Sequence, residues 1–424
     1  MKLLRLGRTD DPVSLTDAEK RSFLSLYHHP VGFPEGEHRF RDDSRNEWRD
    51  WEAVPGNRIR MLTQSLQKSG FMPHAAHDGI FGYVTQAAVR LFQEYVRTTD
   101  LPAVTDGQFP PSWPDGVVGA DTTFHLKRWE REDRRTRWSD EERSPDHDRW
   151  IRWLQDCKAH YRQAPTETMR HLIGAARRGD SLVPDAWEFD PDEPHLVGLR
   201  FGATSGLPAG RTRPVDDLFV LLLRGKTFYF WGSVDANPRQ GREGYLTEGQ
   251  HLYRFDWHNI SPNRRTRIYK AARPAGAGVM VIRDVHDDNA LTSRNRRDGF
   301  DPVPNPTFNV HWSGLGISNW SAGCQVISGS SYLNDRDEFI DCGPFTARND
   351  RERGGRRVAG GPRLTMGAYT LLSDLLLVYT KQQEPGIKPI FRYTLLPEDA
   401  CSRVPGIPYD ELQERLRRLR ATIT

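Results

Sequence analysis

The sequence predicts a multidomain α+β protein in which a small helical module and a helical linker precede a mainly-β domain with a late helix. The length of 424 residues is sufficient for two or three domains with separate cores. Apolar residues recur at helical spacing before residue 183 and alternate after residue 194. The segment between them, 183–194, is rich in Pro and Asp and is typical of a boundary.

The composition indicates a folded chain without a nucleic-acid surface. Its 12 Trp, 13 Tyr and 19 Phe supply core material. The net charge is only +3, and acidic and basic residues mix in runs such as 130–135, as they do on solvated helix faces. The four cysteines are widely spaced and include no CxxC pair, so neither zinc nor a disulfide framework is favoured. We therefore expect no metal, no cofactor and no nucleic-acid partner.

The N-terminal part divides into a polar segment, 1–50, to which no role is assigned, and a helical domain, 51–130. Apolar residues at helical spacing from Ile59 to Leu66 mark a first helix, which Gly70 ends.

A tight turn, "DGIFGYVT" at 78–85, precedes the second helix, and we expect Thr85 to cap that helix. The turn recurs 37 residues later as "DGVVGADT" at 115–122. The repeat indicates a duplicated helical unit; two helix starts of similar composition are the alternative.

The string "DGIFGYVTQAAVRLFQ", from Asp78 to Gln93, resembles the peptidoglycan-binding domain type 1 family. That family is a three-helix module attached to bacterial and phage cell-wall enzymes. The resemblance implies a peptidoglycan partner, both stem peptides and glycan. The second copy of the turn lacks the Ala-Val and Phe-Gln pairs that follow the first.

The remaining chain is divided into a charged helical linker (131–185), the mainly-β domain (186–400) and a C-terminal helix (401–424). Two aromatic-rich runs around Arg224-Gly225-Lys226 predict a β-hairpin. The most apolar stretch, 367–380, carries Asp374 and is too short to cross a bilayer, so it predicts a core helix and no membrane span. Further strands are predicted at 250–257, 278–285, 308–312, 324–327 and 390–396.

The stretch "FNVHWSGLGISNWSAGCQVIS", 308–328, contains the candidate chemistry. Cys324 follows His311 by 13 residues, and His311 is the last histidine of the chain, so any base for this thiol precedes it. Alternation places Asn309 and His311 on one strand face, and the glycines between allow the chain to fold back. If His311 lowers the pKa of Cys324, we expect alkylation of that thiol to be fast near neutral pH and to slow sharply in His311→Ala. A buried thiol in a Gly-rich turn is the alternative.

The pattern of a strand histidine followed by Ser-x-Gly-Cys resembles the L,D-transpeptidase catalytic domain family. The resemblance implies that Cys324 is the nucleophile and His311 the base. It also implies that the Trp312 carbonyl orients the imidazole, that the Gly323 and Cys324 amides stabilise the oxyanion, and that Ser321 matches the family's hydroxyl residue. The residues predicted to contact substrate are Asn309, Ser313 and Trp320.

The chain also departs from that family's pattern. Ala322 stands where the family usually has a second histidine, and Val326 stands where it usually has arginine. The spacing from histidine to cysteine is shorter than usual. These departures leave open both transfer and hydrolysis, and they motivate an alternative in which the domain is degenerate and the protein only binds or supports the wall.

The acidic run "RDVHDDN", 283–289, is predicted to be a polar loop rather than a cation site.

The N-terminus lacks the apolar stretch of a secretory signal, so we expect synthesis in the cytoplasm without a signal peptide. A wall-active enzyme would then reach its target after lysis or by a secretion or contractile injection apparatus, as a lysin or an effector.

Overall fold

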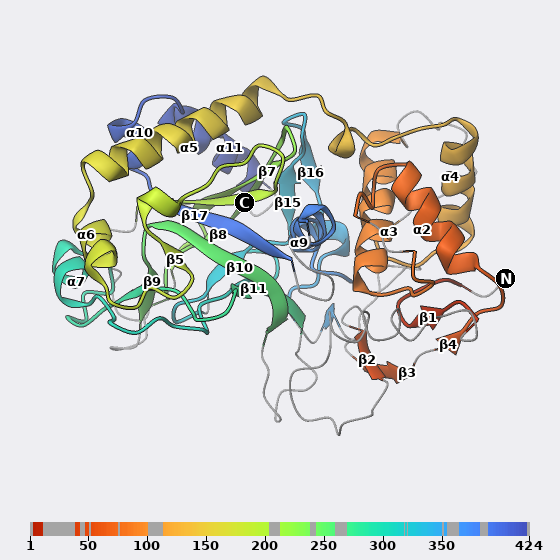
Figure 1. Cartoon of the computed structure of the whole chain (residues 1–424), viewed down its shortest axis with the longest axis horizontal. Helices are drawn as coiled ribbons and strands as arrows, with labels where there is room; N and C mark the ends of the chain where they lie inside the picture. Colours follow the sequence, from red (N-terminus) through yellow and green to blue (C-terminus); the bar gives the residue numbers. More distant parts are fainter. Residues whose placement is uncertain are drawn as a thin grey trace.

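A group of helices precedes the long strands of the sheet along the chain, as the sequence predicts. The computed structural model is an α+β protein in which N-terminal helices pack beside a mixed β-barrel that is followed by late helices (Figure 1). The residues that the structure describes are 3–11, 39–42, 47–50, 52–74, 77–100, 113–202, 213–237, 243–258, 269–317, 319, 321–349, 352–353, 364–381 and 389–421.

The N-terminal helices match the predicted helical segments. They are α2 (Arg58–Lys68), α3 (Tyr83–Tyr95) and α4 (Ala120–Arg131). Helix α2 buries the predicted apolar face and ends before Gly70, whose φ of +85° is left-handed. A Cβ at Gly70 would lie 1.9 Å from the Ser139 hydroxyl, so both the backbone and the close packing require glycine there.

The two DGxxG turns share the same side-chain hydrogen bond, as expected both for a duplicated unit and for two similar helix starts. Asp78 accepts a hydrogen bond from the Ile80 N–H at 3.0 Å, and Asp115 accepts one from the Val117 N–H at 2.8 Å. The prediction that Thr85 caps its helix is wrong. Helix α3 begins at Tyr83 after Gly82, and the Thr85 hydroxyl instead donates to the Ile80 carbonyl at 3.3 Å.

The barrel closes because the first and last strands of the barrel order pair with each other. In the described part of the chain, eight strands follow the order β14-β13-β11-β10-β17-β6-β7-β8, and β8 then pairs with β14. The pairs β13–β14 and β17–β6 are parallel, and the other neighbours are antiparallel. The barrel strands are β6 (His195–Arg200), β7 (Asp217–Leu223), β8 (Lys226–Ser233), β10 (Gly249–His258), β11 (Tyr269–Pro274), β13 (Val310–Trp312), β14 (Gln325–Ile327) and β17 (Ile390–Pro397).

Short strands lie outside the barrel. β15 (Ser331–Leu333) and β16 (Phe339–Asp341) extend the sheet from β8, and β5 (Ser181–Leu182) pairs with β10. The remaining pairs are β1 (Arg8–Thr9) with β4 (Glu52–Ala53), β2 (Arg39–Asp42) with β3 (Glu47–Asp50), and β9 (Gly244–Leu246) with β12 (Val281–Arg283).

The predicted hairpin is formed by β7 and β8. Its two turn residues, Arg224 and Gly225, both have positive φ, at 46° and 89°. This is the turn that matches the right-handed twist of the paired strands. All residues of both strands are buried, since helices cover the sheet here.

Helix α9 (Ala368–Tyr379) joins the helical part to the barrel (Figure 1). Every residue of this predicted core helix is buried. Arg90 on α3 donates two hydrogen bonds to Asp374 on α9, at 2.6 and 2.7 Å, with both side chains buried. The Tyr379 hydroxyl donates to the Gly70 carbonyl at 2.9 Å. One hydrophobic core therefore runs from the N-terminal helices into the barrel.

The segment predicted as a charged linker instead covers the barrel. It contains α5 (Pro145–Gln163) and α6 (Glu167–Gly174), and α5 runs along the barrel in Figure 1. Trp150, Trp153 and Cys157 on α5 are buried in the core on that side, as expected for Cys157. The apolar face of α5 outweighs its many charges, which line the opposite face.

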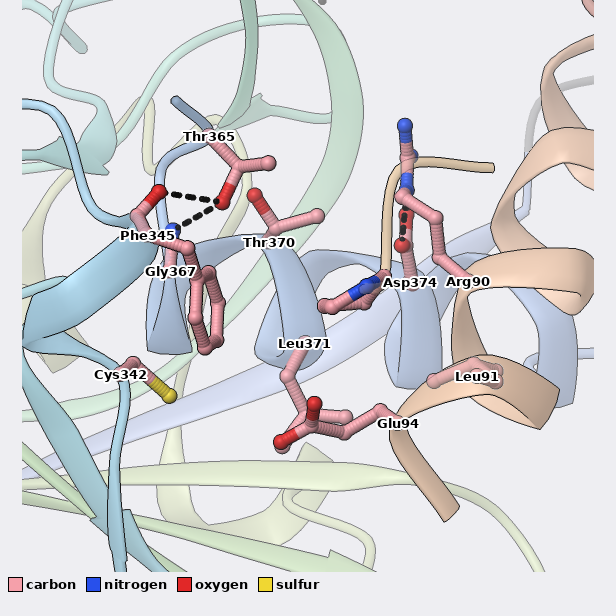
Figure 2. Close-up of a pocket in the computed structure, with 11 residues that line it drawn as sticks. Arg90, Leu91, Glu94, Cys342, Phe345, Thr365, Gly367, Thr370, Leu371 and Asp374 are labelled. Atoms are coloured by element: carbon pink, nitrogen blue, oxygen red, sulfur yellow. Dashed lines mark hydrogen bonds and ion pairs between the residues drawn. The ribbon is translucent and has the colours of Figure 1, made fainter. Parts of the chain in front are cut away.

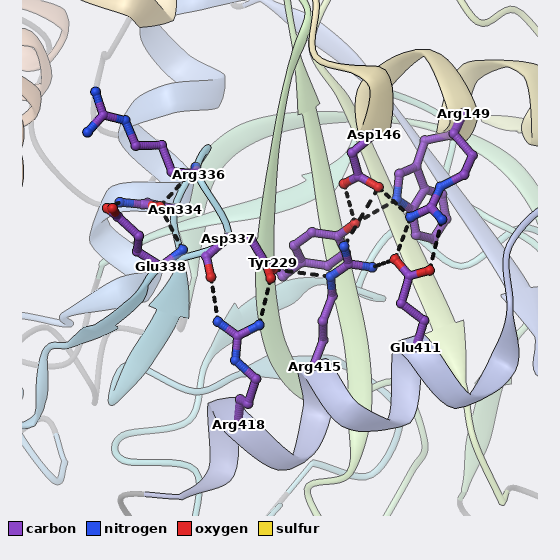
Figure 3. Close-up of polar contacts among 11 residues, drawn as sticks. Asp146, Arg149, Tyr229, Asn334, Arg336, Asp337, Glu338, Glu411, Arg415 and Arg418 are labelled. Atoms are coloured by element: carbon purple, nitrogen blue, oxygen red, sulfur yellow. Dashed lines mark hydrogen bonds and ion pairs between the residues drawn. The ribbon is translucent and has the colours of Figure 1, made fainter.

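The late helices α10 (Ala400–Arg403) and α11 (Tyr409–Arg420) pack beside α5. Figure 3 shows the polar contacts that fix α11: Arg149 on α5 donates to Glu411 at 2.8 Å, and Arg418 donates to Asp337 at 2.6 Å. The Tyr229 hydroxyl on β8 donates to Asp146 at 2.6 Å. No helix in the described ranges combines the length and apolar character needed to cross a bilayer.

Candidate thiol–imidazole site

The site is built on the parallel strands β13 and β14. His311 on β13 pairs with Val326 on β14, and Cys324 lies two residues before Val326. Cys324 directly precedes β14 (Gln325–Ile327), and side chains two residues apart point to the same side, so the register directs the Cys324 side chain to the side of the strand pair that carries His311. The structure therefore brings the predicted pair to one face of two adjacent strands.

The loop between the strands folds back through left-handed glycines. Gly314 and Gly316 have φ values of +68° and +81°. A Cβ at Gly314 would lie 2.2 Å from the Arg348 carbonyl oxygen. These glycines permit the short return that places β14 beside β13.

His311 is oriented by the backbone. Its Nδ1 lies 2.9 Å from the Trp312 carbonyl oxygen, which can only accept, so Nδ1 carries the proton and Nε2 is the basic nitrogen of the neutral ring. This is the contact that the resemblance implied for Trp312. The Tyr269 hydroxyl lies 3.1 Å from the same Nδ1. Burial lowers the pKa of His311 to about 4, against a smaller raising effect of the Trp312 bond.

Cys324 rests as a thiol. Its Sγ donates to the Thr307 carbonyl at 3.2 Å and accepts from the Asn309 N–H at 3.5 Å. Burial raises the pKa of Cys324, although the Asn309 N–H, the Ser321 hydroxyl and the Arg273 charge oppose that rise. Desolvation of the thiolate therefore outweighs the nearby donors, and the effect is opposite to the lowering that an activating His311 would cause.

The turn that carries the thiol is held on both sides. The Ser321 carbonyl accepts from the Asn237 N–H at 2.7 Å, and the Ala322 carbonyl accepts from the Gly244 N–H at 3.1 Å. The Gly323 N–H donates a long 3.4 Å bond to the Ser321 hydroxyl. A Cβ at Gly323 would lie 2.5 Å from the Phe308 ring, which explains glycine next to the sulfur. An oxyanion role for the Gly323 and Cys324 amides stays a prediction.

Of the residues predicted to contact substrate, Asn309 and Ser313 are described and Trp320 lies outside the described residues. Asn309 is 7% exposed, and its Oδ1 has no hydrogen-bond partner within the described ranges. The Ser313 hydroxyl oxygen is likewise buried without a partner there, while its N–H donates to the Ile327 carbonyl at 3.0 Å. Both side chains retain the capacity to bind a further polar group.

Two further residues, His258 and Tyr269, contact His311 and were not predicted from the sequence. They are the paired ends of β10 and β11. The His258 ring stacks on the His311 ring, with centroids 4.3 Å apart and planes 24° apart, and the Asn309 amide nitrogen lies 3.0 Å from His258 Nδ1. The alternating pattern at 250–257 could have indicated His258, since it is the next residue of that strand.

Two small pockets lie elsewhere, and α3 and α9 contribute residues to both. Figure 2 shows the smaller one, which is lined by residues including Arg90, Cys342 and Asp374. Neither is lined by His311 or Cys324. Cys342 is fully buried, and burial raises its pKa. These pockets therefore belong to the junction of the helical part and the barrel.

The acidic run at 283–289 is a hydrogen-bonded loop. The Asp284 carboxylate accepts from the Asp288 and Asn289 N–H groups at 3.0 and 2.7 Å and from the Asn295 amide at 2.7 Å. Within the described residues, no group of three or more His, Cys, Asp and Glu side chains could hold a metal ion.

Comparison with family models, curated proteins and solved structures gives no match to this chain.

Proposed function

We propose that the protein is a peptidoglycan-active cysteine enzyme that cleaves or exchanges stem-peptide bonds through a thioester on Cys324. The observation that carries the proposal is the pairing of His311 on β13 with β14, the strand that Cys324 directly precedes, with His311 Nδ1 fixed on the Trp312 carbonyl. That bond leaves Nε2 as a base. The "DGIFGYVTQAAVRLFQ" string and the Ser-x-Gly-Cys turn both resemble families that act on this polymer.

The proposed first step transfers one proton and forms one bond. His311 Nε2 takes the Cys324 proton as the sulfur attacks a stem-peptide carbonyl, and the Gly323 and Cys324 N–H groups donate to the resulting oxyanion. The carbon–nitrogen bond then breaks, and the His311 imidazolium returns its proton to the leaving amine. The product is a thioester on Cys324.

The second step regenerates the thiol. Water or an amine attacks the thioester while His311 accepts a proton from the attacking group, and the carbon–sulfur bond breaks. The imidazolium then protonates the departing thiolate. Water gives hydrolysis, as in an endopeptidase or L,D-carboxypeptidase, and an amine gives L,D-transpeptidase-like exchange. In either case the enzyme would act as a lysin, or as an effector delivered by a secretion or contractile injection apparatus.

A second candidate is a non-catalytic wall-binding or structural protein. Two observations favour it. Burial raises the pKa of Cys324, and the thiol donates a hydrogen bond to the Thr307 carbonyl, so the site favours the protonated thiol, which is less nucleophilic than the thiolate. Ala322 and Val326, where the resembled family has histidine and arginine, point the same way.

Muropeptide analysis of sacculi incubated with the pure protein separates the two functions. We expect the wild type and Cys401→Ala to change the stem-peptide profile and Cys324→Ala to leave it unchanged. Cys401 is a suitable control because it is also half-buried and lies outside the site. A profile that stays unchanged with the wild type, while the protein still sediments with sacculi, would support the binding function instead.

A further inference from the structure

The structure places a second imidazole directly against the candidate base. His258, at the end of β10, stacks on His311 with ring centroids 4.3 Å apart. Its ring also packs against Tyr269, with centroids 5.2 Å apart, and Tyr269 contacts His311 Nδ1. His258 and Tyr269 thus hold the His311 ring on two sides.

His258 is also joined to the thiol through a single residue. The Asn309 side-chain nitrogen can only donate, so at 3.0 Å it donates to His258 Nδ1. The backbone N–H of the same residue donates to Cys324 Sγ at 3.5 Å. Movement of the His258 ring would therefore alter both the ring stacked on it and the segment that contacts the sulfur.

We propose that His258 is a positioning residue that holds His311 beside Cys324, and that the two imidazoles titrate as one coupled pair. A proton on either ring disfavours a proton on the other, because two like charges about 4 Å apart repel strongly in a partly buried site. Neutral His258 permits the transient imidazolium that the proposed reaction needs, and protonated His258 opposes it. This inference rests on the proposed function for its catalytic meaning, but the coupling itself can be measured without substrate.

The other charged or titrating groups near His258 are the same residues in the wild type and in a His258 variant. They include Tyr269 on β11, Arg353 with its guanidinium 5.4 Å from the Tyr269 ring centroid, Cys324 beside Asn309, and Arg273, whose charge acts on Cys324. On β10 itself Asp256 lies two residues before His258. None of these groups is altered by a substitution of His258, so a shift in the His311 titration reports the imidazole pair.

The test is a histidine side-chain NMR titration of the full chain, comparing the wild type with His258→Gln and His258→Phe. Glutamine keeps an acceptor for Asn309, and phenylalanine keeps a stacked ring, but neither takes a proton. We expect the His311 titration to move to higher pH in both variants, by at least about one pH unit. His160→Gln, on α5, is the matched control and should leave the His311 titration unchanged.

A His311 titration that stays in place in either His258 variant would overturn the proposal. Amide spectra recorded on the same samples verify that each variant is folded. A muropeptide assay on the same variants separates this failure from failure of the proposed function. Coupling can be absent while the wild type still processes sacculi, and coupling can be present in a protein that processes nothing.

Discussion

At the scale of single residues, burial favours the neutral forms of the Cys324 thiol and the His311 imidazole. His311 has a pKa of about 4 and Cys324 has a raised pKa, in both cases chiefly because burial disfavours the charged form. Near pH 7 the resting pair is thus thiol and imidazole rather than thiolate and imidazolium. Proton transfer must then accompany attack on a substrate.

This resting state predicts that His311→Ala has little effect on alkylation of Cys324 but a large effect on stem-peptide turnover. Alkylation of Cys324 by iodoacetamide should be slow near pH 7, should rise only as the pH exceeds the usual thiol range, and should change little in His311→Ala. Stem-peptide turnover by that variant should fall by about 10²–10⁴-fold, because a general base acts in the transition state.

Cys157, Cys342 and Cys401 are internal references for the alkylation, since burial raises the pKa of each thiol. Rapid alkylation of Cys324 at pH 6–7 that is lost in His311→Ala would indicate a resting ion pair and contradict the neutral one.

At the scale of elements, the strong local patterns were predictable from the sequence and the pairing of distant strands was not. The hairpin, the α9 core helix and the DGxxG turns each depend on neighbours in the chain, and each is confirmed. Barrel closure by β8 and β14 joins residues nearly 100 positions apart, with no local signal. His258 was missed for the same reason: only strand pairing brings it to His311.

The β7–β8 turn gives a prediction at this scale. Gly225→Ala should destabilise the protein by about 1–3 kcal/mol, because alanine disfavours the left-handed backbone and its Cβ would lie 2.8 Å from the Glu142 carbonyl oxygen. Gly174→Ala is the control, since a Cβ there meets nothing within 4 Å. Urea denaturation measures both; equal midpoints for the two variants would show that the turn does not require glycine.

At the scale of the whole molecule, the helical part and the barrel are fixed to each other rather than tethered. The Arg90–Asp374 pair is buried at their junction, and the Tyr332 hydroxyl on β15 donates to Glu94 on α3 at 2.7 Å. A wall-binding module held in this way would present the barrel to the polymer in one orientation. The contacts that fix the two parts join residues far apart in the sequence, so they were not predictable from local patterns. The charged composition of 131–185 had instead predicted a linker.

The buried ion pair at this junction predicts a large loss of stability when Asp374 is replaced. Asp374→Ala should lower the free energy of unfolding by about 3–5 kcal/mol, because it leaves the Arg90 guanidinium buried without this partner. Asp192→Ala removes the exposed partner of Arg143 and should cost less than about 1 kcal/mol. Denaturant unfolding of both variants measures the difference, and similar small costs would mean that the junction contributes little to stability.

The central claim is a thioester on Cys324, and intact-protein mass spectrometry after acid quenching of a reaction with purified stem peptides tests it most directly. We expect the wild-type mass to increase by the acyl part of the peptide, with the increase on the fragment that contains Cys324. The Cys324→Ala protein should gain no mass. Peptides that are consumed by the wild type without any adduct, or an adduct of equal size on Cys324→Ala, would contradict catalysis through this cysteine.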